Sequence, residues 1–165
     1  MKKSTKTRSR SRSPIQRPSF EPSGILAKHS NSRASKALKY TEPPDAHRPT
    51  THWRVFIFKD EEEYDPIDLH TSSFYLIGRD IDMVDILVAN PSASKQHAAF
   101  QFRMRNGKVC LYIIDLQSTN GTFLNDEQIQ DSRYYQVRNK DVITFGQSKR
   151  KYVMIEGESL KVRKK

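Results

Sequence analysis

Short apolar runs separated by polar turns recur along the chain from Trp53 onward. The run 53–58 is rich in aromatic and β-branched residues, and apolar and polar positions alternate over 97–103; both patterns are typical of strands. Further apolar runs lie at 74–77, 86–88, 109–114, 122–124, 128–129, 134–137, 141–145 and 152–155. Turns every ~8–12 residues and no helical period predict an all-β sandwich or barrel.

The dipeptide Asn106-Gly107 lies between two of these runs. Asn and Gly tolerate the positive φ angles that a two-residue type I′ turn requires. The sequence therefore predicts a β-hairpin with its turn at these two residues.

Carboxylates gather in two other segments. Residues 60–65 contain five of them, and Asp80, Asp82 and Asp85 follow further along. The second group lacks the central glycine and the bidentate glutamate of a calcium loop, and nothing in the first fixes a ligand geometry. We interpret both segments as solvated loops and expect neither a metal nor a cofactor.

Charge is distributed unevenly along the chain. Residues 1–50 contain 12 Lys/Arg and 3 Asp/Glu, whereas residues 51–157 contain 13 and 15, and residues 158–165 contain 4 and 1. We expect a disordered basic arm over 1–50, a folded domain over 51–157 and a basic tail over 158–165. The arm includes an alternating Arg-Ser tract at 8–13, which resembles those of splicing factors and suits phosphorylation by kinases. Such an arm can contact RNA or acidic surfaces and direct nuclear import, or it can serve solubility alone.

A few apolar residues interrupt the polar arm. They are Ile25, Leu26, Leu38 and Tyr40. Sparse apolar anchors in a disordered segment are typical of a motif that folds on binding a partner, although chance also produces them. We interpret them as a partner-binding linear motif within about residues 20–48.

Other classes of protein are disfavoured by composition. One cysteine, Cys110, allows neither an internal disulfide nor a cysteine-based zinc site. The chain has no apolar run of the ~20 residues that span a bilayer, and its N-terminus lacks the apolar core of a secretory signal. We therefore expect an intracellular protein without membrane contact.

Five loop residues have side chains suited to phosphate: Arg79, Ser94, Lys95, Thr119 and Asn120. Arginine grips phosphate with a planar fork, lysine adds a point charge, and hydroxyl and amide groups donate hydrogen bonds. No carboxylate pair or activated nucleophile accompanies them. Such a set binds a phosphate and leaves it intact, so we expect no enzyme.

A hydrolase is the alternative that Ser94 and His97 bring to mind. A nucleophile elbow needs glycine on both sides of the serine, and here the flanking residues are Ser92-Ala93 and Lys95-Gln96. A buried histidine that hydrogen-bonds its loop suits His97 better. Gly78 and Gly121 are expected to give the backbone room at turns.

The motifs Gly78-Arg79, Ser94-Lys95-Gln96-His97 and Asn120-Gly121-Thr122 resemble those of the forkhead-associated (FHA) domain. The resemblance covers about residues 53–156 and implies an eleven-stranded β-sandwich that reads phosphothreonine. It implies that Arg79, Ser94 and Lys95 hold the phosphate, that Thr119 and Asn120 hold the peptide, and that Gly78, His97 and Gly121 build the loops. Lys95 stands where arginine is commonest, which keeps the charge and loses the fork.

A narrower resemblance covers most of the chain. The segments 39–46, 53–54, 91–98 and 133–135 are similar to those of the pre-mRNA leakage and Smad nuclear-interacting protein family. Members of that family are FHA subunits of the pre-mRNA retention and splicing (RES) complex. The resemblance implies a nuclear, spliceosome-associated adaptor whose arm docks on the RNA-recognition-motif subunit and whose pocket binds a phosphothreonine on a splicing protein. Two alternatives stay open: a structural subunit with an unused pocket, and a protein that binds RNA through its basic arm.

Overall fold

The computed structural model describes residues 32–33 and 36–159. β1 (Ser32–Arg33) and β2 (Lys36–Ala37) form a small antiparallel pair in a unit that ends at Leu38. A second compact unit begins at Lys39 and contains all other strands. The Arg-Ser tract, Ile25, Leu26 and tail residues 160–165 lie outside the described residues.

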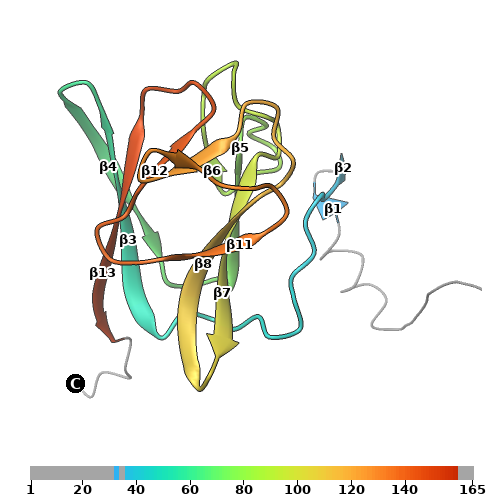
Figure 1. Cartoon of the computed structure of the whole chain (residues 1–165), viewed down its shortest axis with the longest axis vertical. Coiled ribbons are helices and arrows are strands. Elements are labelled where there is room, and N and C mark those ends of the chain that lie inside the picture. Colours follow the sequence, from blue (N-terminus) through green and yellow to red (C-terminus); the bar gives the residue numbers. More distant parts are fainter. Residues whose placement is uncertain (1–31, 34–35, 160–165) are drawn as a thin grey trace, which may run out of the picture. The chain divides into compact units, whose positions relative to one another are not determined.

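The second unit contains two sheets that lie as facing layers, with β3, β4 and β13 in one layer and β7, β8 and β11 in the other (Figure 1). The six-stranded sheet has the order β10-β9-β12-β13-β3-β4. Its strands are β3 (Thr51–Lys59), β4 (Glu62–Leu69), β9 (Thr122–Leu124), β10 (Glu127–Gln128), β12 (Val142–Phe145) and β13 (Lys151–Ser159).

The five-stranded sheet has the order β11-β8-β7-β5-β6. Its strands are β5 (Phe74–Gly78), β6 (Ile86–Leu87), β7 (Ala98–Arg105), β8 (Lys108–Asp115) and β11 (Tyr134–Val137). All its strand pairs are antiparallel except the parallel pair of β5 and β6. The two sheets confirm the predicted all-β sandwich of eleven strands. Over residues 36–159 the chain forms no helix that could cross a membrane.

The core lies between the inward faces of the two sheets. In β3, Trp53, Val55 and Ile57 are buried and alternate with more exposed residues, as the period-two pattern requires. Phe145 and Tyr152 meet edge to face in the six-stranded sheet, with ring centres 5.1 Å apart. Each such side chain removed from water contributes about 1.5–3 kcal/mol, which is what holds the two layers together.

The hairpin predicted at Asn106-Gly107 is confirmed. β7 and β8 pair in register up to Arg105 and Lys108, so only two residues form the loop. Their φ angles are 55° and 79°, and two positive values in succession define a type I′ turn.

The expectation of an acidic loop over residues 60–65 is wrong for most of that segment. Only Asp60 and Glu61 turn, and β4 begins at Glu62 and pairs with β3. β4 is the edge of its sheet, and its carboxylates and Pro66 are exposed. Charged side chains and proline at an edge discourage pairing with another chain, which explains a strand without an apolar pattern.

The predicted domain boundary at residue 51 also differs from the structure. The segment 39–50, which we call the strap, belongs to the compact unit that contains the sandwich. Tyr40, expected to contact a partner, is 4% exposed, and its hydroxyl donates to Gln101 and lies 2.8 Å from the hydroxyl of Tyr134. Tyr40 therefore anchors the strap to the five-stranded sheet. Leu38 lies in the other unit, and a role for it in partner binding stays a prediction.

An ion pair fixes the strap at a second point. Asp45 accepts two hydrogen bonds from the Arg103 guanidinium, 2.8 Å and 3.0 Å long, and these hold the pKa of the Asp45 carboxyl below its usual range. Arg103 in turn lies over the ring of Tyr134, 4.3 Å from its centre. Gln101 lies on the face of β7 that simple alternation predicts to be exposed to solvent. It is fully buried because the strap covers it.

Candidate functional site

Three loops meet at one end of the sandwich and carry the five residues expected to bind a phosphopeptide. Arg79 follows β5, Ser94 and Lys95 precede β7, and Thr119 and Asn120 follow β8. The backbone N–H of Arg79 donates to the Ser94 carbonyl at 3.0 Å, and that of Thr119 donates to the Ser94 hydroxyl at 3.1 Å. Ser94 thus joins the three loops, and the structure brings all five residues into one neighbourhood.

The close approach of the first two loops depends on Gly78. A Cβ atom at this position would lie 2.0 Å from the backbone carbonyl oxygen of Lys95, a distance that no side chain tolerates. Gly121 has a φ of +88°, in the region that side chains rarely adopt. Both glycines are therefore required by geometry at the places where the loops contact each other.

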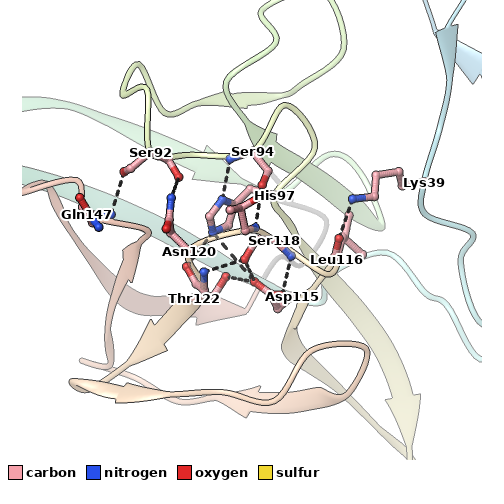
Figure 2. Close-up of polar contacts among 12 residues, drawn as sticks. Lys39, Ser92, Ser94, His97, Asp115, Leu116, Ser118, Asn120, Thr122 and Gln147 are labelled. Carbon is pink, nitrogen blue, oxygen red and sulfur yellow. Dashed lines mark hydrogen bonds and ion pairs between the residues drawn. The ribbon is translucent and has the colours of Figure 1, made fainter.

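The buried His97 links two of the loops from beneath. Its Nδ1 accepts a hydrogen bond from the Ser94 backbone N–H at 3.0 Å, and its Nε2 lies 2.8 Å from the Gly121 carbonyl oxygen (Figure 2). Because Nδ1 accepts, the ring proton must be on Nε2, which donates to Gly121. The neutral imidazole in this tautomer satisfies both loops, so His97 positions the loops.

The burial of His97 makes the stability of the domain depend on pH. Burial lowers the pKa of His97 below its usual value, whereas the unfolded chain titrates near pH 6.5. Below that pH the imidazole is protonated in the unfolded state and stays neutral in the folded state. The free energy of unfolding therefore falls as pH falls, by up to about 1.4 kcal/mol per pH unit. We expect urea unfolding to show this slope between about pH 7 and pH 5.5.

His97→Asn and His47→Gln test the origin of this slope. His47 is exposed on the strap, so its replacement should leave the slope unchanged, whereas His97→Asn should flatten it. A slope that survives in His97→Asn would show that other groups cause it.

The Arg79 side chain is exposed and makes one hydrogen bond within the described part of the chain. Its Nε donates to the Ala93 carbonyl oxygen at 2.9 Å, which leaves the two terminal amino groups available to a ligand. In the part of the chain that the structure describes, no carboxylate forms an ion pair with Arg79. Ser94 accepts from Thr119, so its own hydroxyl proton can be donated, and the exposed Lys95 adds charge.

Asn120 is oriented by the loop opposite. Its Nδ2 donates to the Ser92 carbonyl oxygen at 2.8 Å, which leaves its Oδ1 free to accept a hydrogen bond from a peptide N–H.

Asp115 is a structural residue of the site that sequence reasoning missed. It is 2% exposed and accepts hydrogen bonds from the hydroxyls of Ser118 at 2.6 Å and Thr122 at 2.5 Å, and from the Ser118 N–H at 3.0 Å. It therefore holds the loop that presents Thr119 and Asn120. The signal in the sequence was an aspartate three residues before a serine, a spacing that favours a side-chain-bonded turn.

One cluster outside this site has metal-ligand chemistry. His52, Asp68 and His70 each place one ligand atom within 4.8 Å of the others. Asp68 also accepts a hydrogen bond from Arg54 at 2.7 Å, so a cation already balances its charge. The cluster lies at the ends of β3 and β4 away from their turn.

The comparisons with known proteins agree with this geometry. The FHA domain model matches residues 75–146. The chain is 43% identical over 153 residues to Smad nuclear-interacting protein 1 of Mus musculus, covering 87% of this chain and 40% of that protein. It is 34% identical over 161 residues to pre-mRNA leakage protein 1 of Saccharomyces cerevisiae, covering 79% of each.

A solved structure of the yeast Pml1 splicing factor, from work on its integration into the RES complex, has the same fold. It is 30% identical to this chain, with a TM-score of 0.68, and the match covers 74% of this chain and 99% of that one. The chain spans about two fifths of the length of the mouse relative.

Proposed function

The chain belongs to the FHA domain family that includes yeast pre-mRNA leakage protein 1 and the Smad nuclear-interacting proteins, and we propose that it is a non-enzymatic adaptor of the RES complex that binds phosphothreonine peptides. In this role it acts in pre-mRNA splicing and in nuclear retention of unspliced pre-mRNA. The ligand is a phosphothreonine on another splicing protein.

The observation that carries this proposal is the unpaired guanidinium edge of Arg79 beside Ser94 and Lys95. The two terminal amino groups of Arg79, the Ser94 hydroxyl and the Lys95 ammonium belong to two of the three loops that meet here. This set matches the charge and the acceptor oxygens of a phosphate. We assign Thr119 and Asn120 to the backbone of the peptide.

The partner of the arm is the second part of the proposal. A solved structure of the same fold comes from work on how the yeast Pml1 splicing factor integrates into the RES complex. The family resemblance in the sequence implies that the N-terminal arm of the present chain docks on the RNA-recognition-motif subunit. We assign that contact here to residues 20–38, because the strap that follows is used by the domain itself. Nuclear localisation follows from this assembly.

RNA binding through the basic arm is the competing function. The excess of 12 Lys/Arg over 3 Asp/Glu in residues 1–50 supports it. Binding of this kind falls steeply with salt, because counterions are released from the nucleic acid. Phosphopeptide binding to an ordered pocket is expected to depend on salt much less.

A phosphothreonine peptide library titrated against the whole chain tests the proposal. We expect selected peptides to bind with a micromolar Kd or tighter, and the same peptides without phosphate to bind at least tenfold more weakly. Equal binding of both forms, or binding lost in proportion to salt, would favour the basic arm. No binding to any peptide would favour a structural subunit with an unused pocket.

A further inference from the structure

A second polar pocket lies beside the phosphopeptide loops. It has a volume of about 370 Å³ and lies between the β3–β4 turn, the loop after β6 and the loop that joins β12 to β13. The lining residues that matter here are Lys59, Asp60, Asn90, Gln147, Lys149 and Arg150. None of them belongs to the set predicted to bind the phosphothreonine.

The net charge of this pocket is positive. Lys59, Lys149 and Arg150 contribute three cations, and Asp60 contributes one carboxylate. Among the described residues none of the three cations forms an ion pair. Three cations beside one carboxylate leave a net positive charge in one hollow, and a bound anion would lower the repulsion among the cations.

Arg150 is held in place for this role. Its guanidinium carbon lies 4.9 Å from the ring centre of Tyr64, a cation–π contact that restrains the side chain. Its Nε is inaccessible to solvent and lacks a hydrogen-bond partner, and Arg150 is among the residues that line the pocket. A guanidinium in this lining offers donors that suit two oxygens of a phosphate.

The pocket shares a wall with the phosphopeptide site. The backbone N–H of Gln147 donates to the Ser92 hydroxyl at 2.8 Å, and that hydroxyl donates to Asn90 Oδ1 at 2.6 Å. The Ser92 carbonyl accepts from Asn120 at 2.8 Å, so Ser92 lies between Gln147 and Asn120 (Figure 2). Only Ser92 therefore separates Asn120, which we expect to hold the peptide, from Gln147 in the lining of the second pocket.

We propose that this pocket binds a second phosphorylated side chain of the same peptide that places its phosphothreonine at Arg79. The inference rests on the proposed function and makes it more specific: the ligand is a multiply phosphorylated segment. The second phosphate is held by Arg150 and Lys149, with Lys59 as the third cation.

The test uses the whole chain and peptides with one phosphothreonine. A phosphoserine is placed in turn at each position within about six residues on either side, a reach of about 20 Å in extended chain. We expect one spacing to raise affinity about tenfold or more, as measured by fluorescence anisotropy. Glutamate at the same position distinguishes a need for phosphate from a need for any anion, and we expect it to give a smaller gain.

Three variants assign the effect to the pocket. Arg150→Gln and, separately, the exposed Lys149→Gln should remove the gain and leave affinity for the singly phosphorylated peptide unchanged. Lys151→Gln is the matched control, because Lys151 is exposed, adjacent in sequence and absent from the lining. It should keep the gain. Thermal unfolding shows whether each variant is folded. If Arg150→Gln does not fold, the result with Lys149→Gln alone tests the pocket.

Each other outcome overturns the inference. If singly phosphorylated peptides bind and no second phosphate improves binding, the phosphothreonine site stands and the second pocket fails. If Lys151→Gln loses the gain as well, the effect comes from net charge. If no phosphothreonine peptide binds at all, the proposed function fails and this inference fails with it.

Discussion

Arg79→Ala should abolish measurable binding of phosphothreonine peptides and leave the thermal unfolding of the protein unchanged. The two terminal amino groups of Arg79 are the only planar donor pair at the junction of the described loops, and their loss removes two charge-assisted hydrogen bonds. Such bonds contribute about 1.5–3 kcal/mol each, so affinity should fall about 100-fold or more. Because Arg79 is exposed and its side chain has one recorded hydrogen bond, the fold loses little.

Isothermal titration with a selected peptide checks this prediction against two controls. Arg79→Lys keeps the charge and loses the fork, and it should recover part of the lost affinity. Arg138→Ala removes an exposed arginine whose recorded contacts are made by its backbone, and it should bind like the natural chain. Unchanged affinity in Arg79→Ala would show that the phosphate lies elsewhere.

Removing residues 1–50 should destabilise the domain severely, whereas removing residues 1–38 should not. The longer deletion takes away the strap, and with it the buried Tyr40 ring and the ion pair of Asp45 with Arg103. Loss of a buried aromatic side chain alone costs about 3–5 kcal/mol, against a total stability of about 5–15 kcal/mol. The melting temperature should drop by about 10–20 °C.

Calorimetry of both truncated chains and of Tyr40→Ala measures this loss. Tyr40→Ala should reproduce much of the loss seen when residues 1–50 are removed. The chain that starts at Lys39 should unfold cooperatively and bind phosphopeptide, and it should no longer bind the RNA-recognition-motif subunit if that contact lies in residues 20–38. Equal stability of the two truncated chains would mean that the strap contributes nothing to the fold.

The strap shows where reading the sequence as a linear pattern stops being sufficient. Tyr40 is a lone aromatic among polar residues, and local pattern alone cannot tell a partner-binding anchor from an anchor to the protein's own sheet. The hydrogen-bond partners of the Tyr40 hydroxyl are Gln101 and Tyr134, which lie 61 and 94 residues away in the sequence. They show that Tyr40 is an anchor to the protein's own sheet. Contacts across such separations leave no periodic trace near Tyr40.

β4 shows the same limit in another form. A strand at a sheet edge is stabilised by backbone pairing with its neighbour, and its side chains can all remain in water. Its carboxylates therefore carry no strand signal. Sequence rules work where burial imposes a pattern, and β4 has almost no buried side chain.

The sequence by itself determined the all-β class, the hairpin at Asn106-Gly107 and the identity of the loop residues suited to phosphate, because period-two burial, turn chemistry and side-chain chemistry are local properties. Tertiary structure alone decided that Ser94 joins the three loops, that Asp115 and His97 hold them, and that the strap packs on the five-stranded sheet. It also placed Lys59, Lys149 and Arg150 around one pocket. These arrangements depend on which distant segments of the chain contact each other. The hydrophobic packing of the two sheets determines those contacts throughout the domain.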